Sequence, residues 1–253
     1  MDEMISCNLQ GGLGNLLFQI SAAHSLAISN NDISCFNIST TTGIQHKNPI
    51  KYISNIFRNL NHCTVANSQM YNEPKFSYSP IPYKENLTLN GYFQSEKYFK
   101  NNRSEILKLF NILDVDKTYI ENKYSSILKN SVSVHVRRGD YLYYPNVHPT
   151  QSNDYYNKAL QTINPDNILI FSDDLNWCKN NFKTGHFIHE DDVISLYLMS
   201  YCTNNIICNS SFSWWGAWLN QKDNKKVIAP TSWFGKNGPQ DYQDIYCQDW
   251  TIL

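Results

Sequence analysis

A short strand pattern runs directly into a polar cluster at residues 131–141, which read SVSVHVRRGDY. The β-branched residues of the first half predict a buried strand. A histidine, two arginines, a glycine and an aspartate complete the stretch. Because ligands bind outside the carboxyl ends of strands in open α/β sheets, we expect these polar residues at a binding site. A guanidinium group binds phosphate in a planar, bidentate way, so we expect Arg137 to hold a phosphate, such as the diphosphate of a nucleotide.

The two neighbouring arginines are expected to have different roles. Consecutive side chains at a strand end point in opposite directions, so only one of them faces the ligand. We expect Arg138 to pair internally, for example with Asp140. The alternative for the whole stretch is a strand followed by a salt-bridged turn without a ligand, because ion pairs with a purely structural role are common.

Length and charge restrict the class of protein. The 253 residues and the hydrophobic content of 42% allow one large domain or two small ones with a substantial core. A formal net charge of −1 argues against a general nucleic-acid-binding protein, which would carry a basic face. The acidic start of the chain does not resemble a secretory signal peptide, and no apolar run approaches the roughly 18 residues of a membrane span. We therefore expect a cytoplasmic protein that is not secreted, with peripheral membrane attachment left open.

The seven cysteines are scattered along the chain and form no CxxC pair. Neither a zinc site nor a disulfide framework is therefore predicted. This use of cysteine is typical of a reducing compartment.

A glycine-rich turn follows the first predicted strand, residues 4–9, and precedes a helical pattern that begins at residue 16. Gly11, Gly12 and Gly14 permit a positive φ and a close backbone approach to a ligand. Strand, glycine turn and helix form the arrangement whose N-terminal amides bind anions. The dinucleotide fingerprint would need a third glycine where Leu17 stands. A dinucleotide site and a purely structural tight turn both stay open as alternatives.

The second half of the chain alternates strand and helix patterns about four times, which predicts a parallel, doubly wound sheet. Two further strands in this half end in polar clusters, one at 172–174 and one at 209–213. The Asp173 carboxylate could accept two hydrogen bonds from guanine, whereas Asp174 suits the cap of the next helix better. The serines of the last cluster are expected to bind an anion through hydroxyls and backbone amides.

Two other stretches give weaker signals. Asp114 and Asp116 form a D-x-D tripeptide, a pattern that holds a divalent metal in many sugar-nucleotide enzymes, but a helical pattern follows them. Carboxylates at a helix start stabilise its free amides and its dipole, so we favour that structural role. Residues 37–86 are polar and contain several prolines, which predicts loops with one helix at 50–60.

Four segments of the chain carry a family resemblance. They are GGLGNLLFQ at 11–19, HVRRGDY at 135–141, FSDD at 171–174 and NSSFSWWGAWL at 209–219. In this order they resemble glycosyltransferase family 11, the α-1,2-fucosyltransferases, within a superfamily that includes α-1,6- and protein O-fucosyltransferases. The second and fourth segments are long and specific, whereas residues 37–90 match nothing in the family pattern.

The resemblance implies a two-lobed, GT-B-like α/β fold. An N-terminal lobe at 1–130 would carry the glycine-rich loop on the acceptor side, and a Rossmann-like, doubly wound lobe at 131–253 would bind GDP-fucose. The implied reaction is an inverting transfer of L-fucose from GDP-β-L-fucose to the 2-hydroxyl of a galactose-type acceptor, without a metal or another cofactor. The resemblance implies catalytic roles for Arg137 and Asn15. The residues that it implies for GDP-fucose binding are Gly11, Gly12, Gly14, Asn15, His135, Arg137, Arg138, Asp173, Ser210, Ser211, Phe212 and Ser213.

Individual roles follow from the same resemblance. Arg137 would hold the diphosphate and stabilise charge on the leaving GDP, His135 would touch the nucleoside side, and Asp173 would bind guanine. The serines at 211–213 would frame the phosphates, and residues 11–15 would approach the phosphates and the fucose. One departure matters, because Leu16 stands where the family usually has glutamine. If that position faces the ligand, a polar contact is missing, whereas a leucine facing the core is harmless.

The base that deprotonates the acceptor hydroxyl stays unassigned at this stage. The sequence offers Asp140, Glu96, Glu190 and Asp191 without ranking them. The alternatives to an α-1,2-fucosyltransferase are a transferase for another GDP-sugar or linkage, a non-catalytic nucleotide- or sugar-binding protein, and a dinucleotide oxidoreductase.

Overall fold

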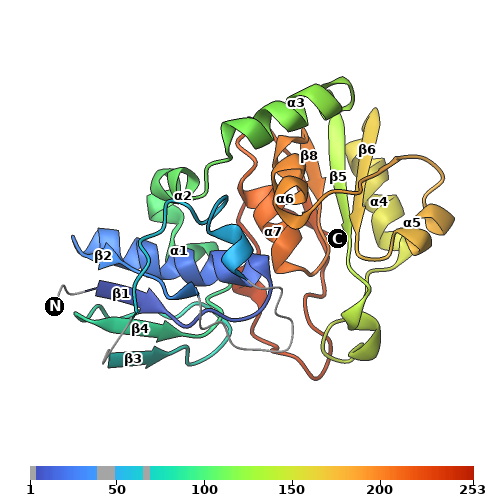
Figure 1. Ribbon diagram of the computed structural model, residues 1–253. Helices are drawn as coiled ribbons and strands as arrows, with labels where there is room; N and C mark the ends of the chain where they lie inside the picture. Colours follow the sequence, from blue (N-terminus) through green and yellow to red (C-terminus); the bar gives the residue numbers. More distant parts are fainter. Residues whose placement is uncertain (1–3, 39–48, 65–68) are drawn as a thin grey trace. The chain divides into compact units, whose positions relative to one another are not determined.

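The computed structural model describes residues 4–38, 49–64 and 69–253, and the chain forms two compact α/β units (Figure 1). Unit 1 comprises Met1–Leu113 and Asp241–Cys247, and unit 2 comprises Asp114–Gln240 and Gln248–Leu253. The boundary therefore lies before the helix α3 (Asp114–Leu128), whereas the sequence suggested a division after residue 130.

Helix α3 belongs to unit 2 because its side chains bind there. Lys123 Nζ and the hydroxyls of Tyr119 and Tyr124 lie 2.6, 2.9 and 2.5 Å from Glu190 Oε1, just before the helix α6 (Asp192–Tyr201). Three donors on one carboxylate fix the helix to this unit, and α3 packs against α6. A largely polar helix without a strong apolar stripe gives no sign of this partner in the sequence.

Unit 1 is built on a parallel sheet with the strand order β2-β1-β4-β3 in the described residues. The first strand is followed by the glycine turn and then by α1 (Leu13–Ser29), which packs against β1 and β2. Small and apolar residues allow this helix to be buried over most of its length. The strands are β1 (Met4–Cys7), β2 (Ile33–Ser34), β3 (Gln69–Asn72) and β4 (Leu87–Asn90).

The remaining elements of unit 1 are short. They are η2 (Pro49–Tyr52), η3 (Glu96–Tyr98), η4 (Lys100–Asn102), α2 (Arg103–Leu109) and η6 (Gln243–Ile245). The last of these returns from the far end of the chain, where Asp241 and Asp244 accept the backbone N–H groups of Ser77 and Tyr78 at 2.8 and 2.9 Å. The prediction for 37–86 missed the strand β3 and expected a longer helix than η2; part of that range, 39–48 and 65–68, lies outside the described residues.

Unit 2 contains a parallel sheet with the order β10-β9-β8-β5-β6-β7. Counted from β5, this is the strand order 3-2-1-4-5-6 of the doubly wound nucleotide-binding fold, so the predicted fold class is confirmed. The central strand is buried at every position. The strands are β5 (Ser131–Val136), β6 (Asn167–Ser172), β7 (His186–Phe187), β8 (Asn204–Ile206), β9 (Val227–Ala229) and β10 (Thr251–Ile252).

Helices cover both faces of this sheet. α4 (Asn153–Ile163) and α5 (Leu175–Asn181) lie on one side, and α6 and α7 (Ser211–Trp218) lie on the other (Figure 1). Three tryptophans of α7, at 214, 215 and 218, are at most 2% exposed and pack edge-to-face or stacked on one another. This aromatic core holds α7 rigidly, and with it the polar residues at its start.

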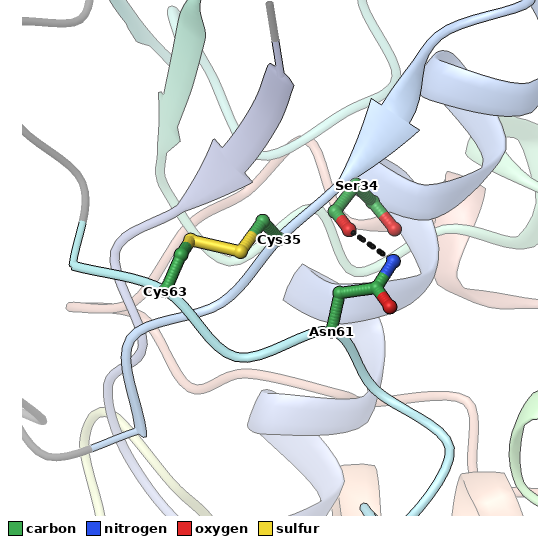
Figure 2. The surroundings of a disulfide bond; sticks show 4 residues. All are labelled: Ser34, Cys35, Asn61 and Cys63. Atoms are coloured by element: carbon green, nitrogen blue, oxygen red, sulfur yellow. Dashed lines mark hydrogen bonds between the residues drawn. A yellow bond between two sulfur atoms is a disulfide. The ribbon is translucent and has the colours of Figure 1, made fainter. Parts of the chain in front are cut away.

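A disulfide joins Cys35 to Cys63 in unit 1, with an S–S distance of 2.11 Å (Figure 2). The sequence prediction of no disulfide was therefore wrong. The two cysteines are 28 residues apart, and they meet because Phe36 forms a parallel bridge with His62 and Asn61 Nδ2 donates to Ser34 O at 3.1 Å. No spacing rule shows this contact. Because disulfides persist mainly in oxidising surroundings, cysteine use no longer supports a reducing compartment.

None of the helices in the described residues combines the length and the apolar character needed to cross a membrane.

The disulfide leads to the first testable prediction. Without reduction, alkylation of the denatured chain should modify five of the seven cysteines, as counted by mass spectrometry. Replacing Cys35 and Cys63 together by alanine should lower the free energy of unfolding by about 2–4 kcal/mol, because the unfolded chain regains the entropy of the closed loop. Cys247→Ala, which removes a buried free thiol of the same unit, serves as the control with a smaller effect. Alkylation of all seven thiols would contradict the cross-link.

Candidate functional site

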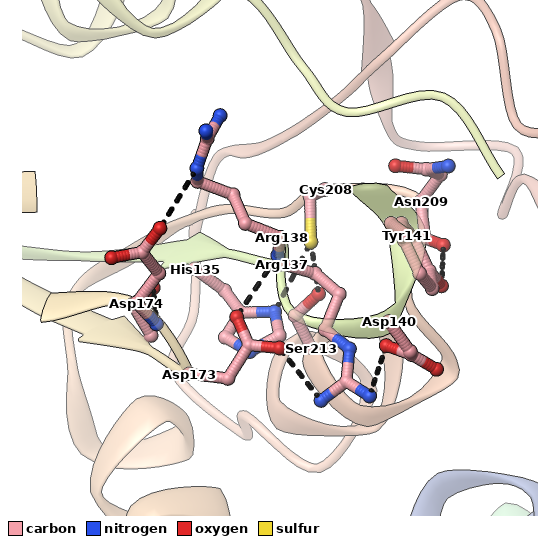
Figure 3. A network of polar contacts seen from close by, with 11 residues as sticks. His135, Arg137, Arg138, Asp140, Tyr141, Asp173, Asp174, Cys208, Asn209 and Ser213 are labelled. Atoms are coloured by element: carbon pink, nitrogen blue, oxygen red, sulfur yellow. Dashed lines mark hydrogen bonds and ion pairs between the residues drawn. The ribbon is translucent and has the colours of Figure 1, made fainter. Parts of the chain in front are cut away.

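The polar residues of unit 2 gather where the strand order reverses. β5 and β8 are neighbours, and the chain leaves them for opposite faces of the sheet. Ligands of open α/β sheets bind at this switch point, outside the carboxyl ends of the strands. Figure 3 shows the residues that meet here from the ends of β5, β6 and β8: His135, Arg137, Arg138, Asp140, Tyr141, Asp173, Asp174, Cys208, Asn209 and Ser213.

Arg137 is the centre of this cluster. Its NH2 nitrogen lies 2.6 Å from Asp140 Oδ1, and its NH1 nitrogen lies 3.2 Å from Asp173 Oδ2. The side chain keeps a third of its surface exposed, at 33%. A guanidinium carries five N–H donors, so two ion pairs leave about three for a ligand. The sequence prediction that Arg137 faces a ligand is compatible with this geometry, because charge and free donors reach the surface together.

The charge of Arg137 is held by its neighbours. Burial alone would lower the pKa of its guanidinium, but the carboxylates of Asp173 and Asp140 outweigh burial and raise the pKa. The two aspartates thereby fix both the orientation and the protonation of the side chain. A preorganised cation of this kind stabilises negative charge without reorganisation when the charge develops.

Arg138 points into a different environment. Its Nε donates to Asp174 Oδ2 at 3.1 Å, and its guanidinium carbon lies 4.4 Å from the ring centre of Trp177. The expectation that Arg138 pairs internally is confirmed, but the partner is Asp174, and Asp140 pairs with Arg137 instead. Asp174 also caps α5 by accepting the N–H of Trp177 at 3.0 Å, as the sequence indicated.

Asp173 connects the two strand ends. Its Oδ1 accepts the backbone N–H of Arg138 at 2.9 Å, while Oδ2 faces Arg137. Gly139 permits this close approach, because a Cβ at that position would lie 2.5 Å from Asp173 Oδ2. Asp173 therefore braces the turn after β5, a role that the sequence did not show. Guanine binding by Asp173 stays a prediction.

His135 is nearly buried, at 6% exposure, and is the second-to-last residue of strand β5, two positions before Arg137. Its Nδ1 lies 3.2 Å from Cys208 Sγ, and its ring centre lies 5.5 Å from that of Phe212. Burial lowers the pKa of His135 to about 3, and the positive charge of Arg137 acts in the same direction. The imidazole is therefore neutral at physiological pH, and it offers hydrogen bonds without adding charge.

The serine-rich segment before and within α7 divides into two environments. Ser213 is buried and donates to the backbone oxygen of Ser210 at 3.2 Å, so its hydroxyl serves the helix start. Ser211 and Phe212 are half-buried and reach the surface at the helix N-terminus. Backbone amides at such a terminus favour anions, which keeps the predicted phosphate contact in place as a prediction.

Three residues of the cluster, Tyr141, Cys208 and Asn209, were missed by the sequence reasoning. Asn209 is buried; its side-chain nitrogen donates to Pro149 O and Trp233 O, each at 3.0 Å, and its backbone oxygen accepts the hydroxyl of Tyr141 at 2.9 Å. These bonds fix the loops around the switch point. Tyr141 and Asn209 lie inside the quoted family motifs, so the motifs indicated these two positions. Only the fold shows their hydrogen-bond partners.

The glycine turn belongs to unit 1, and it forms a cluster of its own. Gly11 has a φ of +86°, and a Cβ there would collide with the side chain of Asn15, whereas a Cβ on Gly12 would meet nothing within 4 Å. Gln94 Nε2 donates to Asn15 Oδ1 at 2.9 Å. The backbone at Gly12 is thus open to a ligand, and the side-chain amide of Asn15 lies beside it.

The position that departs from the family pattern faces the interior. Leu16 is 2% exposed, so the leucine fills the core and does not remove a ligand contact. Gln19, one helical turn later, is fully buried and fixes the strand-to-helix turn through Gln10 N at 3.0 Å and Gly91 O at 3.2 Å.

The candidates for a catalytic base are separated by their contacts. Glu190 binds the donors of α3, whose hydrogen bonds hold its pKa below the usual value although burial acts upward. Asp191 caps α6 by accepting the N–H of Ile194 at 2.8 Å. Glu96 starts the short helix η3 of unit 1. Of the four, Asp140 is the one that lies in the cluster of unit 2.

The D-x-D tripeptide was the candidate metal site in the sequence. Asp114 and Asp116 both lie in the first turn of α3, the structural role favoured from the sequence. Across the described ranges, no group of three or more histidine, cysteine, aspartate or glutamate side chains could hold a metal ion.

The different roles of the arginines can be tested by stability. Arg138→Ala should lower the free energy of unfolding by about 1–2 kcal/mol, because it removes both an ion pair and a cation–π contact. Arg138→Lys should recover part of this loss, since the charge stays but the planar fork that stacks on Trp177 does not. Urea denaturation of both variants provides the measurement. A wild-type midpoint for Arg138→Ala would show that the contacts contribute nothing.

Comparisons with known proteins place the chain in a family. The sequence model of Glycosyl transferase family 11 matches residues 3–253. The O-antigen biosynthesis glycosyltransferase WbnK of Escherichia coli is 32% identical to the chain, and the alignment covers 92% of this chain and 96% of that protein. An alpha-1,2-colitosyltransferase of Escherichia coli is 30% identical, with 92% of this chain and 93% of that protein covered.

The fold agrees with that placement. The solved fucosyltransferase NodZ from Bradyrhizobium superimposes with a TM-score of 0.59 at 11% identity, covering 85% of this chain and 93% of NodZ. This likeness confirms the predicted GT-B-like α/β fold. Because the family model spans the glycine turn, the Arg137 cluster and the start of α7 alike, the chain belongs to glycosyltransferase family 11.

Proposed function

We propose that the protein transfers L-fucose from GDP-β-L-fucose to the 2-hydroxyl of a galactose-type acceptor, with inversion at the anomeric carbon. The observation that carries the proposal is Arg137, a partly exposed cation at the switch point of a nucleotide-binding sheet, with N–H donors left after its two ion pairs. The choice of GDP-fucose as the donor comes from the resemblance of the motifs to those of the fucosyltransferases. The α-1,2 linkage agrees with the name of the colitosyltransferase relative.

The proposed chemistry requires stabilisation of a departing diphosphate. The bond between the fucose anomeric carbon and the diphosphate oxygen breaks, and the acceptor 2-oxygen forms the new bond from the opposite face. Negative charge then builds on the GDP oxygens, where the guanidinium of Arg137 would donate two parallel hydrogen bonds. The proton of the acceptor hydroxyl passes to a base, for which Asp140 is the candidate beside Arg137.

Unit 1 contributes to the proposal through its glycine turn. The backbone at Gly12 is open, and Asn15 Oδ1 accepts a hydrogen bond from Gln94, so the amide nitrogen of Asn15 is the part of that side chain left for a ligand. We propose that this N–H group donates to the sugar or phosphate of the donor. Gly11 and Gly14 have a supporting role, because they shape the turn and start the helix.

A second donor is favoured by a specific finding. The relative at 30% identity carries the name of a colitosyltransferase, so GDP-colitose is the competing donor for the same site and the same linkage. A binding site distinguishes such donors through hydrogen bonds to individual sugar hydroxyls. The similarity to an O-antigen biosynthesis enzyme supports a cytoplasmic site of action within the same proposal, whereas the Cys35–Cys63 disulfide argues for oxidising surroundings.

The assignment of Arg137 predicts a large loss of activity. Arg137→Ala should lower kcat for transfer from GDP-fucose to lactose by about 10²–10³-fold, because the leaving diphosphate loses its cation. The circular dichroism spectrum should stay that of the wild type. Lys117→Ala, on the exposed face of α3, removes a cation of the same unit and should keep full activity. Turnover of Arg137→Ala within a factor of about two of the wild type would refute the role.

A screen of sugar-nucleotide donors, with and without metal chelation, distinguishes the remaining alternatives for the function. We expect transfer from GDP-fucose to β-galactosides at the same rate with and without EDTA, since no step of the proposed reaction needs a metal. Linkage analysis of the product should give an α-1,2 fucoside. A preference for GDP-colitose would show that this sugar nucleotide, and not GDP-fucose, is the donor. GDP binding without transfer would indicate a non-catalytic protein. Loss of activity in EDTA, restored by a divalent ion, would contradict the metal-free reaction.

A further inference from the structure

A buried cysteine lies behind the histidine of the candidate site. Cys208 follows β8 and is 0% exposed, and its sulfur lies 3.2 Å from Nδ1 of His135 on the neighbouring strand β5 (Figure 3). The cysteine cannot touch a bound molecule from this depth. It can act only through the groups that its sulfur contacts.

The charge states of the Cys208 thiol and the His135 imidazole limit how the two groups can interact. Burial raises the pKa of the Cys208 thiol to about 12, and burial lowers the pKa of His135 to about 3. A neutral thiol therefore meets a neutral imidazole at neutral pH. Two arrangements remain: the thiol donates to Nδ1, or a protonated Nδ1 donates to the sulfur.

The other neighbours of the sulfur favour the first arrangement. The nearest alternative acceptor for the thiol proton is Ser213 Oγ, at a longer 3.8 Å. Ser213 in turn uses its own hydrogen on Ser210 O. We therefore take the thiol as the donor to His135 Nδ1, which is the closer of the two acceptors that the thiol hydrogen can reach.

A thiol that donates to Nδ1 places the ring proton on Nε2. Within the described part of the chain, Nε2 has no hydrogen-bond partner, and it is not among the side-chain atoms that are fully enclosed without one. This nitrogen therefore keeps access to the surface at the switch point, beside Arg137 and Phe212.

We infer that Cys208 is a positioning residue: its thiol holds His135 in the Nε2–H tautomer, so that a directed, uncharged N–H donor faces the bound nucleotide next to the Arg137 guanidinium. The inference rests on the proposed function for the nature of the ligand.

The tautomer can be measured without substrate. Nitrogen-15 NMR of histidine-labelled protein distinguishes protonated from unprotonated ring nitrogens, and His135→Gln identifies the signals of this ring. The wild type should show a protonated Nε2 and a hydrogen-bonded, unprotonated Nδ1. Cys208→Ala should shift the Nδ1 signal, because the donor is lost. Cys208→Ser should restore it, since a hydroxyl replaces the thiol as donor. A protonated Nδ1 in the wild type, or unchanged signals in Cys208→Ala, would overturn the inference.

Binding supplies the second readout. Calorimetry should show the Kd for GDP rising about three- to tenfold in Cys208→Ala and recovering in Cys208→Ser, as expected for one misdirected hydrogen bond. Cys202→Ala is the matched control, because it removes another thiol that is 0% exposed in unit 2 and donates to Leu198 O. It should change stability but neither the His135 signals nor the affinity. A rise in Kd that is equal in Cys202→Ala and Cys208→Ala would reduce Cys208 to a packing residue.

The two proposals fail in different ways. If the wild type binds no GDP, the proposed donor class is wrong, while the tautomer comparison still decides the role of Cys208. If GDP binds and fucose is transferred but the tautomer is the opposite one, the proposed function stands and the inference falls. If Cys208→Ala does not fold, the wild-type spectrum and Cys208→Ser carry the decision.

Discussion

The ion pair between Arg137 and Asp173 is the interaction on which the candidate site depends. It exists because β5 and β6 pair in register, with Val136 opposite Ser172, so the next residue of each strand continues the alignment. The carboxylate then receives both the guanidinium of Arg137 and the backbone N–H of Arg138. The pairing of β5 with β6 over several residues therefore fixes the position of the Arg137 guanidinium.

The strand order adds the remaining groups to that cation. β8 lies against the other side of β5, so the residues that follow β8 reach the back of His135 and the turn of the arginines. The tryptophan-rich core of α7 then holds the start of that helix. Residues that are about 70 positions apart in the sequence meet because of topology alone.

The features that follow from hydrophobic patterns along the chain were predicted from the sequence. The contacts between residues far apart in the chain were missed. Buried β-branched runs and the regular alternation with helices indicated the doubly wound sheet, and the polar strand ends indicated the members of the cluster. The partner of Arg138 was misassigned because Asp140 is two residues away, whereas Asp174 becomes a neighbour only through the sheet. The Cys35–Cys63 bond and the short strand β3 were missed for the same reason, since neither has a local signature.

The cluster combines charge and direction in separate residues. Arg137 carries the positive charge, but two carboxylates offset part of it, so an incoming diphosphate meets a weakened positive field together with the N–H donors that the ion pairs leave. This weakening limits the binding of anions that offer only charge. His135 is neutral and cannot attract an anion over a distance, yet a fixed N–H group contributes only to a ligand whose acceptor lies in the right place. A paired cation beside a neutral, oriented donor therefore selects for the shape of the ligand as well as for its charge.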